Sequence, residues 1–100
     1  MSDSSQQEIF RAKVNLETSR IAWKELQRFF ASGAAVWVSK ELDLVDVALQ
    51  ISEDNKSQVS IWMSAKQLSA VADEQARTWY QQDAEVWAVV VSPFVLIQEI

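Results

Sequence analysis

The sequence predicts an α/β domain in which a small three-stranded, mostly parallel sheet is covered by about four helices. Segments with helical spacing of apolar residues alternate along the chain with short β-branched runs, an order typical of strands joined by helical crossovers. One hundred residues is the size of a single domain with one core. The composition, with 49% hydrophobic and 23% charged residues but one Gly and one Pro, excludes disordered and low-complexity chains.

The first residues of the chain carry two competing patterns. The stretch Ser5 to Glu8 has the spacing of a capping box, which favours a helix start. Residues 10–17 instead alternate between apolar and polar side chains, which is the period of a strand. We predict a short helix within residues 5–17, and we interpret residues 1–15 as a partly ordered extension of a single domain at residues 16–100.

The segment that follows has helical spacing and ends before Gly33, the only glycine in the chain. Thr18 or Ser19 is suited to cap this helix, and glycine is favoured just after a helix end. Its bulky apolar side chains recur on one face, at Trp23, Leu26 and Phe30. Residues 34–38 are then expected to form a buried strand, because they are apolar and rich in valine.

Two further helices are expected before the next strand. Ser39 or Asp43 is a plausible cap for the first, which extends to about Ser52 with its leucine and valine side chains inward. The second is shorter and ends near Lys66, and its apolar side is formed by Val59, Trp62 and Met63.

The rest of the chain is predicted to alternate between strands and a helix. Residues 68–72 form a possible short strand, and Asp73 caps a helix that holds Ala76, Trp79 and Tyr80. Residues 86–91 and 94–98 are extended pieces, the first of them rich in valine. Val90 lies within the first piece, so we expect it to be buried and expect Val90→Asp to prevent folding.

The residue types exclude most catalytic chemistry. The chain has no His and no Cys, which removes catalytic triads, zinc sites and haem ligation. A single Gly removes the phosphate-binding loops that need several glycines. The carboxylates of Glu41, Asp43 and Asp46 lack a calcium-loop pattern, so we interpret them as a solvated acidic face. We predict no catalytic residues, no cofactor and no metal, and an enzyme is the less favoured class.

Charge is distributed unevenly along the chain. Residues 1–40 hold six basic and four acidic side chains, whereas residues 41–100 hold three basic and ten acidic ones. The net charge of −5 and the sparse Lys and Arg argue against nucleic acid as a partner. Basic side chains recur every four residues on the predicted helix, which gives either a solvated face or a docking site for an acidic protein: Arg20, Lys24 and Arg28.

Five Trp in one small domain have two explanations. Core packing accounts for most of them, because they fall at core-facing positions of the predicted helices and strands. The alternative is a Trp-rich pocket that binds a small molecule or catalyses a minor reaction on it. Glu17, Arg20 or Asp43 would then lie at the mouth of the pocket.

The N-terminal sequence predicts the compartment. It is polar and lacks the basic and apolar regions of a signal peptide. The longest apolar run is shorter than the ~20 residues that span a membrane. We therefore expect a cytoplasmic protein without a membrane segment.

The apolar segment at the end of the chain predicts self-association. We expect Pro93 to displace the following residues from the preceding strand and to leave them exposed beside a sheet edge: Phe94, Val95, Leu96 and Ile97. A closed homodimer would cover this patch without leading to fibres. The alternative is that the segment folds back onto the first helix within one chain.

Four stretches of the sequence are distinctive: LETSRIAWKELQRFFASG, LDLVDVA, DEQARTW and VWAVVVSPFVLIQE. Together, over residues 16–99, they resemble domain-of-unknown-function family 2288. The resemblance implies a small bacterial, cytoplasmic protein of a family without an assigned activity or catalytic residues. The favoured function is therefore a non-enzymatic, self-associating protein-interaction domain.

Overall fold

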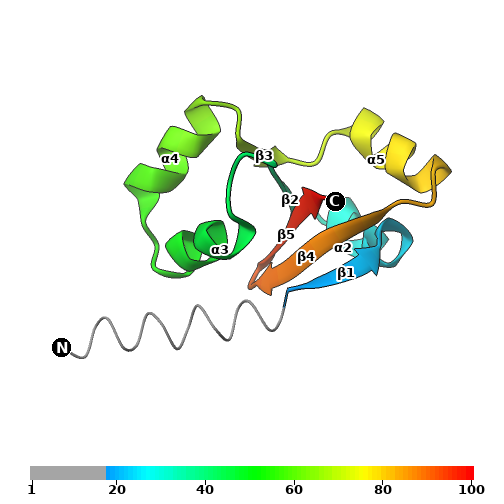
Figure 1. The fold of residues 1–100 in the computed structure, drawn as a ribbon, viewed down its shortest axis with the longest axis horizontal. Coiled ribbons are helices and arrows are strands. Elements are labelled where there is room, and N and C mark those ends of the chain that lie inside the picture. Colours follow the sequence, from blue (N-terminus) through cyan, green and yellow to red (C-terminus); the bar gives the residue numbers. More distant parts are fainter. Residues whose placement is uncertain (1–17) are drawn as a thin grey trace.

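The computed structural model describes residues 18–100, and the short helix predicted within residues 5–17 lies outside the described residues. The described chain contains five strands, four α-helices and one 3-10 helix (Figure 1). Their order is β1 (Ser19–Ala22), η1 (Trp23–Leu26), α2 (Gln27–Ala31), β2 (Ala35–Val38), α3 (Leu44–Ser52), α4 (Lys56–Ser64), β3 (Leu68–Ala70), α5 (Asp73–Gln81), β4 (Glu85–Val91) and β5 (Phe94–Glu99). None of these helices has the length and apolar character needed to cross a membrane.

The strands form one mixed sheet in the order β1-β4-β5-β2-β3. Only β2 and β5 are parallel, and the other three pairs are antiparallel. The α/β class and the four helices are confirmed, but the prediction of a three-stranded, mostly parallel sheet is wrong. Only Ser92 and Pro93 separate β4 from β5, and two residues are too few for the crossover that a parallel pair needs.

The predicted helix after Thr18 is correct only in its second half. Ser19–Ala22 form the edge strand β1 instead, and a helical backbone begins at Trp23. The four-residue strand is held by antiparallel pairing with β4, from Ser19 opposite Ala88 to Ala22 opposite Glu85. Tertiary pairing therefore overrides the local helical spacing in this segment.

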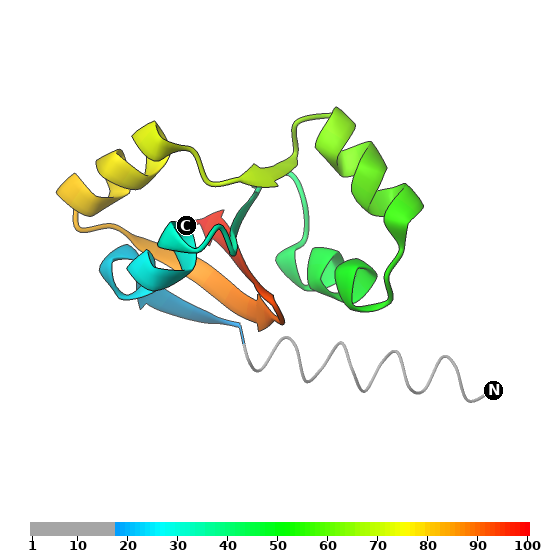
Figure 2. The same cartoon turned by 180° about the vertical axis from the view of Figure 1, so that it is seen from behind.

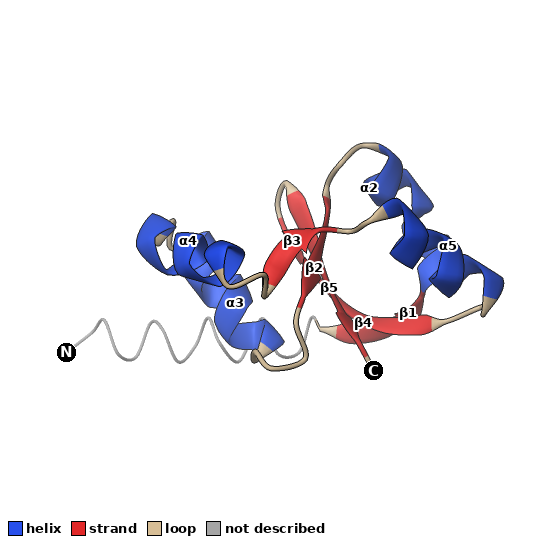
Figure 3. Cartoon of the chain, turned by 90° about the horizontal axis from the view of Figure 1, so that it is seen from above, coloured by secondary structure: helices blue, strands red, loops and turns tan. Residues whose placement is uncertain are grey.

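Helices cover both faces of the sheet (Figure 3). One face carries α3 and α4, whose core cluster includes Val47, Val89 and Leu96. The other face carries η1, α2 and α5, and its cluster includes Trp23 and Ile97. Figure 2 brings α2, in cyan, to the front of strands β1 and β4. The central strand β5 is therefore buried on both sides at residues 95–97, which explains why this part of the strand is apolar and carries no charge.

Val90 is 63% exposed, so the prediction that it is buried is wrong. Its neighbour Val89 points to the opposite face and is only 2% exposed. Val90 lies near the end of β4, on the same face as the buried Val86 and Ala88. The helices on that face therefore cover the beginning of β4 but not its end.

Each α-helix is followed by a residue with positive φ. Gly33 has φ +80°, as expected from the sequence, but Asp54, Lys66 and Asp83 also have positive φ, at 57°, 61° and 53°. Each follows the C-terminal end of a helix. At Lys66, the backbone N–H donates to the Met63 carbonyl and the next N–H donates to the Trp62 carbonyl, as in a Schellman motif.

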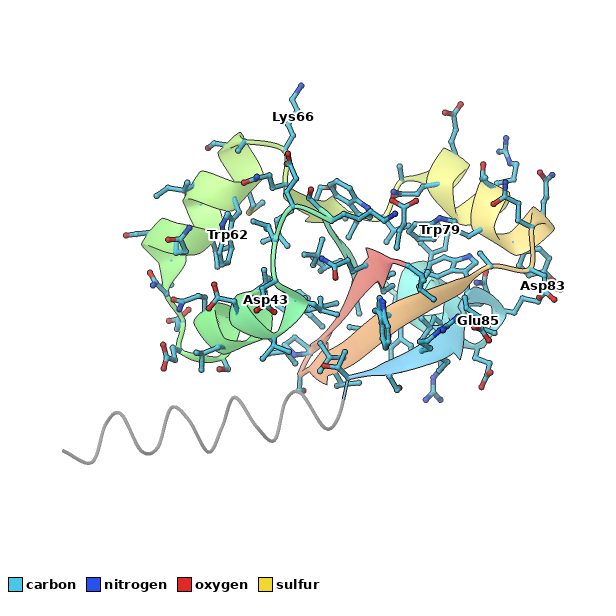
Figure 4. The ribbon with its side chains drawn as sticks, viewed as in Figure 1. Asp43, Trp62, Lys66, Trp79, Asp83 and Glu85 are labelled. Carbon is cyan, nitrogen blue, oxygen red and sulfur yellow. The ribbon has the colours of Figure 1, made fainter. Side chains whose placement is uncertain are left out.

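Replacement of Lys66 by Gly is expected to stabilise the protein. A side chain with Cβ costs about 1 kcal/mol in the left-handed region, and the Lys66 side chain extends into solvent (Figure 4). Urea unfolding should therefore show a gain of somewhat less than ~1 kcal/mol for Lys66→Gly. The matched control is Gly33→Ala, which should lose a similar amount, because an added Cβ meets no atom within 4 Å and only φ is strained. A Lys66→Gly protein without any gain would contradict this account.

Candidate interaction surface

An apolar groove of about 490 Å³ lies between α4 and the neighbouring ends of β2, β3 and β5. Val36 and Leu68 contribute to its sheet side, and Val59 and Met63 contribute from α4. Phe94 lines the groove from the start of β5. The groove is not evident from the sequence, because it is formed by elements that are distant in the sequence.

Large apolar side chains at this groove remain exposed. Met63 is 57% exposed and Phe94 is 38% exposed, and Ile61 on the same helix is 60% exposed. Within α4, only Trp62 is buried, and it belongs to the core cluster shared with α3 (Figure 4). One signal in the sequence could have indicated this surface: three consecutive apolar residues, Ile61 to Met63, cannot all face inward from one helix.

The strand β3 leaves one edge of the sheet open beside the groove. Within the described chain, β3 is the last strand on its side and pairs only with β2. The Ser39 N–H donates to the Gln67 carbonyl at 2.9 Å, and the Val71 N–H donates to the Ala35 carbonyl at 3.3 Å. Because bonding alternates along an antiparallel pair, the backbone groups of Leu68 and Ala70 point away from β2, toward the open edge.

The predicted apolar interface is mostly buried inside the chain. Val95 is 2% exposed, and Leu96 and Ile97 are 0% exposed, because β5 lies between β4 and β2 under both helical layers. The expectation that this segment is left exposed is therefore wrong for three of its four residues. Phe94 alone stays accessible, at the lip of the groove.

The predicted basic stripe does not form on one helix. Arg20 lies in β1, and its guanidinium is 3.2 Å from the Glu85 carboxylate. The Lys24 ammonium is 3.3 Å from the Asp83 carboxylate. Arg28 stacks over the ring of its neighbour Phe29, at 4.8 Å from the ring centre. These exposed contacts engage all three basic groups within the chain, away from the groove.

The carboxylates near the start of α3 have local structural roles. Asp43 caps this helix, since its side chain accepts hydrogen bonds from the Val45 and Asp46 N–H groups (Figure 4). The Glu41 carboxylate accepts from the Ser39 hydroxyl and from the Gln67 side-chain amide. No group of three or more potential metal ligands occurs within residues 18–100.

The Trp side chains do not surround one pocket. Trp23 and Trp79 pack edge to face in the core at 5.0 Å, as the sequence suggested for most of the Trp residues. Trp37 and Trp87 are half-buried on the sheet, and the groove beside α4 has no Trp in its lining. Of the residues expected at a pocket mouth, Arg20 and Asp43 make the contacts described above, and Glu17 lies outside the described residues.

A comparison with protein families identifies the family of this chain. A family model described as "Protein of unknown function (DUF2288)" matches residues 9–99. The chain is also similar to PA1075 from Pseudomonas aeruginosa, a protein solved by NMR in solution. The two chains are 44% identical with a TM-score of 0.80, and the match covers 91% of this chain and 84% of that one. No match was found among curated proteins. The resemblance seen in the sequence is confirmed, and the chain belongs to the DUF2288 family of proteins of unknown function.

Proposed function

We propose that this protein is a non-enzymatic interaction domain of the bacterial cytoplasm that self-associates as a homodimer. The observation that carries this proposal is the open edge of β3, which lies beside an apolar groove with exposed side chains on its wall. Soluble proteins usually cover or blunt such an edge, because it can pair with another chain. Neither nucleic acid nor a membrane is part of this proposal.

The second copy fits the β3 edge through a twofold axis. If a twofold axis passes beside Ser69, it places the β3 strands of the two copies next to each other and antiparallel. The outward N–H and C=O groups of Leu68 in one copy then face those of Ala70 in the other. The two sheets become one continuous sheet, and the contact closes on itself instead of extending into a fibre.

Apolar side chains next to the edge add buried area to this contact. Met63 and Phe94 stand on the groove wall with much of their surface exposed. Covering such side chains contributes roughly 25 cal/mol per Å² of apolar surface removed from water. Of the four interface residues predicted from the sequence, only Phe94 belongs to the interface proposed here. Its three buried neighbours do not, and residues of β3 and α4 form the rest of the contact.

Ala70→Pro is expected to convert the dimer to a monomer without loss of fold. Proline removes the outward N–H of Ala70 but no hydrogen bond to β2, and proline is tolerated on an edge strand. Light scattering at low micromolar concentration should give twice the 11.4 kDa chain mass for the native protein and one chain mass for the variant.

The matched control is Val71→Pro. It removes the N–H that donates to the Ala35 carbonyl, so it should lower the melting temperature instead of splitting a folded dimer. A native protein that is strictly monomeric at these concentrations would refute the homodimer. A dimer that is indifferent to Ala70→Pro would place the interface elsewhere.

The second candidate function is binding of a small molecule. Its candidate site is the groove beside α4 and not a Trp-rich pocket. Its volume of about 490 Å³ lies in the range of ligand sites, ~300–1,000 Å³, and apolar side chains line much of it. A metabolite screen by melting temperature separates the two functions. A rise of several degrees with one compound, lost in Met63→Lys, would favour the ligand site.

A further inference from the structure

The segment that contains β3 carries opposite charges at its two ends. Residues 67–72, which read QLSAVA, hold no charged side chain. Lys66 precedes them, and Asp73 and Glu74 follow them in the first turn of α5. Figure 1 shows β3 between the end of α4 and the start of α5. The uncharged edge strand therefore has one basic side chain before it and two acidic side chains after it.

These three charged side chains are exposed and do not pair with each other or with other charges of the described chain. Among residues 18–100, no ion pair joins Lys66, Asp73 or Glu74 to another side chain. The Lys66 side chain extends away from the ribbon beyond β3 (Figure 4). The two acidic side chains are favourable at the N-terminal end of α5 because of the helix dipole, and this effect needs no basic partner.

The backbone stays extended beyond the three residues of β3. The Ser39 N–H donates to the Gln67 carbonyl, and the Val71 N–H donates to the Ala35 carbonyl, so pairing with β2 continues at both ends. Ala72 is also extended, with φ −77° and ψ 152°. An antiparallel contact between two copies can therefore be followed over residues 67–72.

The twofold contact proposed above brings the opposite ends of this segment together. Leu68 of one copy faces Ala70 of the other, so the same register brings Lys66 near Ala72, the residue just before Asp73. Facing Cα atoms in an antiparallel pair are about 4.5–5.5 Å apart, and the long lysine side chain reaches a neighbouring carboxylate across this distance. A parallel pairing would instead place each charge beside the same charge of the other copy, which is destabilising.

We propose that the second copy is recognised by two symmetric charge pairs, each between Lys66 of one copy and the carboxylates of Asp73 and Glu74 of the other. This inference rests on the proposed homodimer and adds what selects its register. The backbone groups of a three-residue strand also fit registers that are shifted along the strand. Opposite charges across an interface set the orientation of the partners and disfavour wrong ones. The backbone and the groove supply attraction, and the charges at the two ends supply the orientation.

Lys66 then has two opposing effects. Its positive φ of 61° lowers the stability of the single chain, whereas its charge contributes to the dimer. Lys66→Gly should therefore gain stability in urea at protein concentrations too low for association, and it should bind a second copy less tightly than the native chain does.

Charge reversal tests the pairing. One variant is Lys66→Glu, and the other is Asp73→Lys with Glu74→Lys. Each places like charges at both ends of the contact, so analytical ultracentrifugation should give a dimer dissociation constant at least about tenfold above the native one. Asp73→Asn with Glu74→Gln adds no basic side chain to the start of α5 and should weaken the dimer in the same direction. Circular dichroism should show the native fold in each variant, because these side chains are exposed.

Mixing the two reversed variants distinguishes a contact between copies from a contact within one chain. In a mixed dimer, both ends join opposite charges again. The mixture should therefore associate at least about tenfold more tightly than either variant alone. Native mass spectrometry identifies the mixed dimer by its mass. A variant that carries all three reversals should dimerise by itself for the same reason.

The matched control is an ion pair within one chain. The Lys24 ammonium is 3.3 Å from the Asp83 carboxylate, and Asp83 follows the end of α5 that is further along the chain from β3. Lys24→Glu and Asp83→Lys make the same kinds of charge change. Each should change the dissociation constant much less than Lys66→Glu does, and mixing the two should not tighten association.

The outcomes separate this inference from the homodimer on which it rests. A dimer whose dissociation constant is unchanged by Lys66→Glu would overturn the charge pairs and leave the homodimer standing. Weaker association of both reversed variants without recovery in their mixture would also overturn the charge pairs, because the charges would then act within one chain. A native protein that is monomeric at low micromolar concentration would refute the homodimer and the charge pairs with it.

Discussion

Val89→Asp is expected to abolish folding, whereas Val90→Asp is expected to leave the fold intact. Val89 is 2% exposed and packs in the cluster with Val47 and Leu96. Among residues 18–100 no basic side chain is buried that could pair with a carboxylate there. An unpaired charge at such a site costs several kcal/mol, comparable to the 5–15 kcal/mol stability of a typical domain. Val90 is 63% exposed, so its carboxylate variant keeps contact with water.

Circular dichroism and thermal melting of the two variants provide the measurement. The residues are adjacent in one strand and undergo the same substitution, so β-propensity and added charge are matched between them. The Val90→Asp protein should keep the native spectrum and lose at most about 1 kcal/mol of stability. If both variants fold, the sheet face under α3 is not sealed; if neither folds, the end of β4 is buried by a partner.

The difference in exposure between Val89 and Val90 shows what the sequence alone can predict. A valine-rich run identifies β4 as a strand, but burial at each position depends on how far the covering helices reach. The helix α3 was predicted closely, because Asp43 caps it and its apolar spacing is local in the sequence. Its boundaries depend on residues within a few turns of each other.

The strand β1 was missed because its evidence is not local. Ser19–Ala22 are strand only through pairing with β4, which lies at the other end of the chain. The sheet order, the buried state of Leu96 and the groove beside α4 depend in the same way on distant segments. The segment around Leu96 illustrates the consequence: its apolar character was evident, but whether the domain or a second copy covers it was not.

Trp23→Ala is expected to lower the free energy of unfolding by about 3–5 kcal/mol, the range for removal of a large buried aromatic side chain. Trp23 is 0% exposed and contacts the rings of Trp79 at 5.0 Å and Phe30 at 5.7 Å, both edge to face. Its indole Nε1 donates to the Ala76 carbonyl at 3.0 Å. The residue therefore links η1 to α2 and α5 above one face of the sheet.

Urea unfolding, followed by circular dichroism, measures this loss against two controls. Trp87→Ala removes the same side chain from a half-buried position where it contacts the Arg20 guanidinium at 5.8 Å, so its loss should be clearly smaller. Trp23→Phe keeps an aromatic ring but removes the Nε1 donor, and it should fall between the other two. A Trp23→Ala protein no less stable than Trp87→Ala would show that η1 and α5 are held together by other contacts. The packing of η1, α2 and α5 on the sheet would then contribute less to stability than the packing of α3 and α4 on the opposite face, where Trp87 lies.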